Sequence, residues 1–92
     1  MRATVVGLVT PHLLRIVDLA NAAQKGVSVR FHLHDAVARS MAEMADQYNA
    51  SALAAAYVEG LENVAGQAPR ACTEYVGVLQ AAAETARRLG RD

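Results

Sequence analysis

The sequence has one cysteine, no tryptophan, one phenylalanine and two prolines in 92 residues. The lone Cys72 excludes an intrachain disulfide framework of the kind that supports many small secreted domains. Alanine makes up roughly a fifth of the chain, so small side chains dominate any apolar interior. We therefore expect one thin-cored domain over residues 1–92, in which the elements approach closely and aromatic packing is sparse.

An excess of charge of either sign is also absent, because nine basic and nine acidic side chains cancel. A nucleic-acid-binding protein should carry a basic face, so no nucleic-acid partner is expected. The N-terminal apolar stretch extends for only about seven residues before Pro11, too few to span a bilayer. We accordingly expect a cytoplasmic protein with no membrane partner.

The first third of the chain has the pattern of a strand, a helix and a second strand. Residues 3–10 are apolar and β-branched, and Pro11 after Thr10 is typical of a helix start. An apolar stripe at helical spacing follows until Gly26, which predicts the end of that helix. Apolar and polar residues then alternate strictly over 27–34, which predicts a strand. This order predicts a βαβ unit with parallel strands.

The remainder leaves two questions of structure open. A helix beginning at Asp35 extends to residue 64, either unbroken or interrupted at 49–51. Beyond it, 69–89 is either one helix or a strand over 73–79 followed by a helix. We prefer the second interpretation because EYVGVLQ echoes the N-terminal TVVGLVT. The predicted fold is thus a small α/β domain of the βαβαβα type with a short, mainly parallel sheet; the alternative is an all-α helical hairpin.

Polar residues follow the predicted strands at the edge where α/β proteins bind ligands. Thr10, His12 and Arg15 lie at the start of the first helix, where free N–H groups and a guanidinium favour an anion. His34 and Asp35 close the second strand. These five residues form the predicted small-ligand site.

The same strand end offers a metal site. Residues i and i+2 of a strand point to the same side, so His32 and His34 could both bind one zinc ion, with Asp35 or His12 as a third ligand. A solvated polar face would explain the same two histidines without a metal. No cofactor other than this zinc ion is expected.

Cys72 is the one candidate catalytic residue. Its proximity to Arg70 is consistent with a reactive thiol, whereas in a helical 69–89 it would be a small core residue. No specific catalytic constellation accompanies it, so an enzyme is the less favoured interpretation.

The segments VVGLVT and DLANAAQKGVSVRFHLHDAV, together with ACTEYVGV around Cys72, resemble the small sulfur-handling proteins of the DsrE/TusD-like family. The resemblance implies an oligomeric α/β protein, in some members with a sulfur-carrying cysteine. On that basis Cys72 would be the sulfur carrier.

Three functional hypotheses follow. The favoured one is a self-associating binding or assembly module, because exposed sheet edges and a thin core call for a second copy. Such a module would bind a protein partner or a small ligand. The other two are a small-ligand or metal site at the strand ends, and sulfur relay through Cys72.

Overall fold

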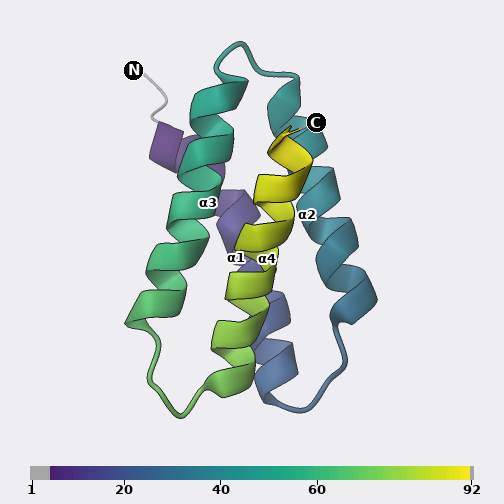
Figure 1. Cartoon of the computed structure of the whole chain (residues 1–92), viewed down its shortest axis with the longest axis vertical. Helices are drawn as coiled ribbons and strands as arrows, with labels where there is room; N and C mark the ends of the chain where they lie inside the picture. The colour runs from purple at the N-terminus through teal and green to yellow at the C-terminus, as the bar shows by residue number, and fades with distance from the viewer. Residues whose placement is uncertain (1–4, 92) are drawn as a thin grey trace.

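A computed structural model describes residues 5–91, and in that range the regular secondary structure is entirely α-helical, with short turns between the helices (Figure 1). Its four helices are Val5–Gln24 (α1), Arg30–Ala45 (α2), Ala50–Gln67 (α3) and Thr73–Arg91 (α4). The prediction of an α/β fold with a parallel sheet is therefore wrong, since the described part of the chain contains no strand. The all-helical alternative gave the right class, although the chain forms four helices. The first two residues of the strand predicted over 3–10 lie outside the described range.

Helix α1 runs straight through the segment predicted as the first strand. Val9 and Ile16 are completely buried on its inner side. A valine costs a helix only a few tenths of a kcal/mol relative to alanine, whereas burying such a side chain contributes about 1.5–3 kcal/mol. Packing therefore outweighs β propensity here. The prediction that Pro11 begins the helix is also wrong, because Pro11 lies inside α1.

The end of α1 was predicted correctly. Gly26 has a φ of 96°, a left-handed conformation that glycine adopts without steric cost. Its N–H donates to the Ala23 carbonyl at 3.0 Å, and the Val27 N–H donates to the Ala22 carbonyl at 3.0 Å. This pair of hydrogen bonds is the Schellman motif, which satisfies the carbonyls that a helix end leaves free.

The alternating segment 27–34 is the turn before α2 and the first residues of that helix. Burial from this segment onward follows helical rather than strand spacing: Val29, Val37 and Met44, which lie on one side of a helix, are all buried. Phe31, which alternation assigned to the core, is 87% exposed. The strand prediction for 27–34 is wrong because a short run cannot show the longer period that decides which side is buried.

The two open questions are now answered. The helix predicted to begin at Asp35 begins earlier, at Arg30, so that predicted start is wrong. The helix is also interrupted, since α2 ends at Ala45 and α3 begins at Ala50. The last segment is the single helix α4, so the preferred strand over 73–79 is wrong. Its buried side is the one that the helical interpretation indicated, with Leu79, Ala83 and Ala86 almost inaccessible to solvent.

The core lies where the four helices meet, and every pair of helices is in contact. Helix α4 is central in Figure 1, with α3 and α2 on either side and α1 behind it. The small residues of α4 allow this close approach, as does Gly60 of α3, where an added Cβ would lie 2.7 Å from Leu13 Cδ1. The largest fully buried side chains belong to Val9, Ile16, Val37, Leu53, Tyr57, Leu61 and Leu79.

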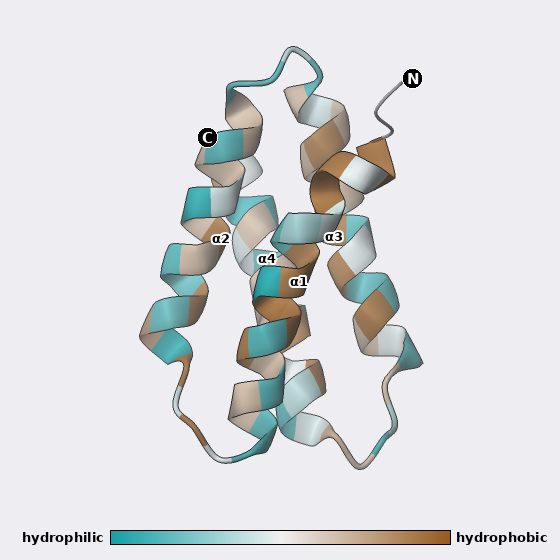
Figure 2. Ribbon diagram, turned by 180° about the vertical axis from the view of Figure 1, so that it is seen from behind, coloured by the Kyte–Doolittle hydropathy of each residue, from teal (hydrophilic) through white to brown (hydrophobic). Residues whose placement is uncertain are grey.

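Helix α1 is long and apolar enough, by length and composition, to cross a membrane. The sequence-based prediction judged the apolar stretch too short to span a membrane because it ended that stretch at Pro11, whereas α1 continues through this proline. Figure 2 shows hydrophobic residues along α1, above all in its first turns. A mostly buried core helix of a soluble protein and a signal sequence near the N-terminus pass the same test. Only 17% of the apolar window of α1 is buried, although α1 contributes Val9, Ile16 and Ala20 to the core. The cytoplasmic location stays a prediction.

Candidate functional site

The most concentrated polar contacts of the described residues lie between α1 and α2. His12 Nδ1 is 2.8 Å from Ser40 Oγ, and Arg15 donates from one guanidinium nitrogen to the same oxygen at 3.3 Å. Ser40 is fully buried, and the His12 side chain is largely so. A hydroxyl both donates and accepts, so Ser40 can accept from Arg15 and complete the contact with His12 Nδ1 in either tautomer of the ring.

Glu43 closes this cluster on the solvent side. Its Oε2 lies 3.6 Å from His12 Nδ1 and 4.0 Å from the second terminal nitrogen of Arg15. Glu43 is half exposed, so water screens its ion pair with Arg15, which adds little to stability. Ser40 and Glu43 are three residues apart and share one side of α2, which is why both reach residues on α1.

Tyr57 of α3 lies beneath the same cluster. Its ring meets the His12 ring edge to face, with centroids 6.3 Å apart and an interplanar angle of 81°. The Tyr57 hydroxyl is buried and has no hydrogen-bond partner in the structure. Burial raises the pKa of Tyr57 above its ordinary value of 10.0, and the nearby Ser40 hydroxyl and Arg15 charge oppose that shift. We name these five residues, His12, Arg15, Ser40, Glu43 and Tyr57, the polar cluster.

The polar cluster contains a serine, a histidine and a glutamate but lacks the arrangement of a hydrolase triad. In a triad the serine contacts one ring nitrogen and the carboxylate the other. Here Ser40 and Glu43 both approach Nδ1 of His12. Ser40 is also sealed from solvent, so no substrate carbonyl can reach its oxygen. The geometry holds three helices together and does not activate a nucleophile.

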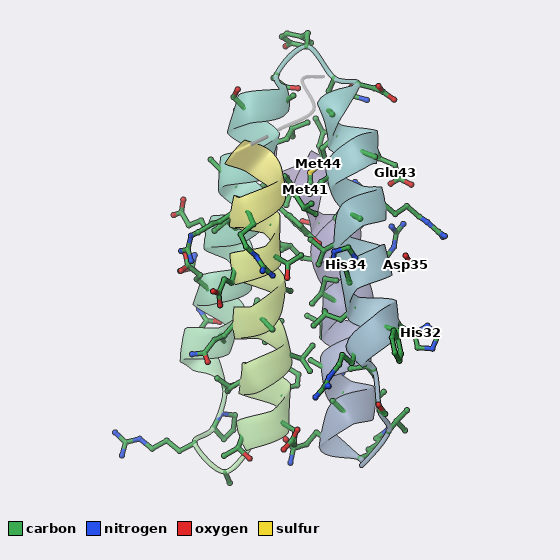
Figure 3. All side chains as sticks on the ribbon, turned by 45° about the vertical axis from the view of Figure 1, so that its right-hand side comes forward. His32, His34, Asp35, Met41, Glu43 and Met44 are labelled. Atoms are coloured by element: carbon green, nitrogen blue, oxygen red, sulfur yellow. The ribbon has the colours of Figure 1, made fainter. Side chains whose placement is uncertain are left out.

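The premise of the predicted zinc site does not hold in a helix. Successive residues of a helix are rotated by about 100°, so His32 and His34 are about 200° apart around α2. Figure 3 shows the two side chains on different sides of α2. Within residues 5–91 there is no group of three histidine, cysteine or acidic side chains placed to hold a metal ion.

The predicted ligand residues are distributed over two places and the surface. His12 and Arg15 belong to the polar cluster. Arg15 also lines a groove of about 370 Å³ between α1 and α2, together with His32 and Asp35. Thr10 instead donates to the Val6 carbonyl at 2.7 Å within α1. His34 is exposed on α2, outside both places.

The groove between α1 and α2 brings together five ionisable side chains. Arg15 and Asp18 come from α1; His32, Asp35 and Arg39 come from α2. Leu19 and Ala36 are the apolar residues that line it. Among the described residues no ion pair within 4 Å connects its two aspartates to its two arginines.

Cys72 lies in the loop between α3 and α4, and its side chain is half-buried. Its carbonyl accepts the Val76 N–H at 3.0 Å, which places Cys72 at the start of α4. Cys72 lines a pocket of about 410 Å³ together with Gln24 and Tyr75. There the Gln24 side-chain oxygen accepts the Tyr75 backbone N–H at 3.1 Å.

Sequence reasoning missed Ser40, Glu43 and Tyr57 as members of one cluster. A signal was present, because Ser40 occupies a position in the series Val37, Ser40, Met44 that helical spacing assigns to the core. A polar residue at such a position has to find a hydrogen-bond partner inside the protein.

The comparisons with known proteins leave the chain without an assigned relative: no family model, no curated protein and no solved structure matches it.

Proposed function

We propose that this protein is a non-enzymatic helical module that works by associating with a second copy of itself. The observation that carries the proposal is the position of the only phenylalanine. Phe31 is 87% exposed on the first turn of α2. Burying such a side chain contributes about 1.5–3 kcal/mol, and this chain leaves that contribution unused in the isolated fold.

The scarcity of aromatic residues adds to this argument. The chain has four phenylalanine and tyrosine residues in all, of which Phe31 and Tyr48 lie almost entirely in solvent. Aromatic side chains are the residues most enriched at the centres of protein interfaces. A chain that uses half of its few aromatics on its surface is therefore expected to bury at least one of them against a partner.

The balance of charge favours a second copy as that partner. The chain has no formal net charge, so two copies do not repel each other as whole molecules. A basic patch for nucleic acid or for anionic lipid would need an excess of arginine and lysine on one side. The groove between α1 and α2 instead carries two arginines and two aspartates.

The test is the solution mass of the purified protein, measured by light scattering at concentrations from about 1 to about 100 µM. We expect a species of twice the 9.7 kDa chain mass at the upper end of that range. A mass of 9.7 kDa throughout would contradict the proposal.

Sulfur relay through Cys72 is the second candidate, supported by the position of the half-buried thiol in a pocket at the start of α4. It requires a thiol that alkylates at neutral pH much faster than an unperturbed cysteine, because the thiolate is the reacting form. The measurement is the rate of iodoacetamide labelling of the folded protein against that of Cys72 in urea. Slower labelling in the folded protein would remove this candidate.

A further inference from the structure

We propose that two copies associate through the outer side of α1 and α2, with Arg39 of each copy against Asp35 of the other. This inference rests on the proposed function and names the surface it uses. The surface consists of Leu14, Arg15, Asp18, Phe31, His32, Asp35 and Arg39, and we call it the α1–α2 face. Arg15 is the one residue that it shares with the polar cluster.

The first argument is the unused charge on this face. Arg39, Asp18 and Asp35 form no ion pair within the described residues, although all three line the same groove. Elsewhere the chain does form such pairs between helices, for example from Arg87 of α4 to Glu62 of α3. The opposite charges of the α1–α2 face are thus available to a partner.

The second argument is the order of these charges along the helices. Helices α1 and α2 are neighbours joined by a short turn and run in opposite directions (Figure 1). Arg39 lies one turn beyond Asp35 toward the end of α2, and Arg15 precedes Asp18 by nearly one turn in α1. Both arginines therefore lie toward the α2–α3 loop, and both aspartates lie toward the α1–α2 turn.

This order makes the face complementary to itself under a two-fold rotation. A two-fold axis perpendicular to the helices places the arginine end of one copy over the aspartate end of the other. This axis keeps α2 over the partner's α2 and α1 over the partner's α1. Arg39 therefore lies against the partner's Asp35, and Arg15 lies against the partner's Asp18, and each contact occurs twice. A copy stacked in the same direction would instead oppose like charges, which disfavours that arrangement.

The third argument is the apolar area beside the charges. Phe31 is 87% exposed and lies one turn before Asp35 on α2; Leu14 is 56% exposed and lies one turn before Asp18 on α1. Apolar anchors bordered by charged residues are the usual composition of a protein interface. The same rotation carries the Phe31 end of one copy toward the Leu14 end of the other.

The side of the molecule that contains the α1–α2 face has room for an interface. Figure 2 views a broad side of the molecule with α1 in front and α2 beside it. The two longer dimensions of the protein are 38 and 26 Å. A side of that size can supply the roughly 800 Å² per partner that a standard interface buries.

A charge-exchange experiment tests the pairing. The variants Arg39→Glu and Asp35→Lys each place two pairs of like charges in the two-fold dimer, so each alone is expected to lose at least tenfold in dimer affinity. Mixing the two variants in equal amounts restores opposite charges at both contacts between residues 39 and 35, as does the double variant Arg39→Glu/Asp35→Lys. We expect both combinations to recover the wild-type dimer.

The controls change charge away from the face. Arg70→Glu in the α3–α4 loop and Glu59→Lys on α3 are exposed changes of the same size and are expected to leave the dimer intact. Circular dichroism establishes that each variant remains helical. Single variants that dimerise as wild type would overturn the α1–α2 face and leave the proposed function standing. A wild-type protein that is monomeric at every concentration would overturn both.

Discussion

Nδ1 of His12 on α1 lies 2.8 Å from the buried hydroxyl oxygen of Ser40 on α2. This hydrogen bond, with the one that Arg15 donates to the same oxygen, joins the first two helices through one atom. These two hydrogen bonds also fix the position of α1 along α2, and so the register of the residues on the α1–α2 face.

Ser40→Ala should destabilise the fold. The substitution removes the hydrogen-bond partner of a largely buried His12 and one partner of Arg15, and a donor or acceptor left unsatisfied costs about 1–3 kcal/mol. Urea unfolding followed by circular dichroism measures the change. Ser28→Ala, at an exposed position before α2, is the matched control and should change stability by less than about 0.5 kcal/mol. Equal effects of the two substitutions would contradict the assigned role of Ser40.

Tyr57→Phe should be close to neutral or stabilising at neutral pH. The tyrosine hydroxyl is buried without a hydrogen-bond partner, so its removal relieves a desolvation cost while the ring stays in the core. Tyr57→Ala should instead cost about 3–5 kcal/mol, as expected for the loss of a buried aromatic ring. Urea unfolding of both variants measures the difference. A strongly destabilised Tyr57→Phe variant would show that the hydroxyl has a partner.

The pH dependence of stability follows from the same hydroxyl. Its folded-state pKa is raised above the value of 10.0 that it has when unfolded. Above pH 10 the unfolded chain therefore loses the Tyr57 proton while the folded chain keeps it, and stability falls as pH rises. Below pH 10 this contribution is fully present. Comparing wild type with Tyr57→Phe in urea on both sides of pH 10 isolates it; identical alkaline losses would contradict the prediction.

Phe31→Ser should separate association from folding. The side chain is 87% exposed, so its loss should leave the free energy of unfolding of the monomer within about 0.5 kcal/mol of wild type. Dimer affinity should fall at least tenfold if Phe31 is an anchor of the interface. Tyr48→Ser is the control, because Tyr48 is fully exposed in the loop at the other end of α2. If Tyr48→Ser abolished the dimer and Phe31→Ser did not, the interface would lie at the α2–α3 loop instead.

Ala83→Leu should show how closely α4 packs in the centre of the bundle. Ala83 is almost fully buried, and the added side chain has to displace neighbouring helices, which costs about 1–3 kcal/mol. Ala81→Leu, on the exposed side of the same helix, should be tolerated. Thermal unfolding of the two variants gives the comparison, and an unperturbed Ala83→Leu variant would indicate a loose core.

Several local features of this fold could be predicted from the sequence. Gly26 ends α1 because few other residues accept a positive φ, and the buried side of α4 follows from the spacing of Leu79, Ala83 and Ala86. The class of the fold could not be inferred from 27–34, since eight residues of alternation also fit the exposed start of an amphipathic helix. Pro11 was equally misleading, because a helix can continue through a proline when packing offsets the lost hydrogen bond.

Only part of the candidate site could be predicted from the sequence. His12 and Arg15 are three residues apart, and helical spacing alone places them on neighbouring positions of α1. Their partners Ser40 and Glu43 belong to the next helix, and which residues of two helices meet depends on the crossing and the register of the pair. His32 and Asp35 do share a groove with Arg15, but through helix packing and not through the strand ends that predicted it.

The most direct test of the account is the mixing experiment on the α1–α2 face, followed by light scattering. The account predicts that Arg39→Glu and Asp35→Lys are each monomeric alone, at a concentration where the wild type is dimeric. Their equimolar mixture should then have twice the 9.7 kDa chain mass. A mixture that stays at 9.7 kDa, or single variants that dimerise as wild type does, would contradict the pairing of Arg39 with Asp35 across two copies.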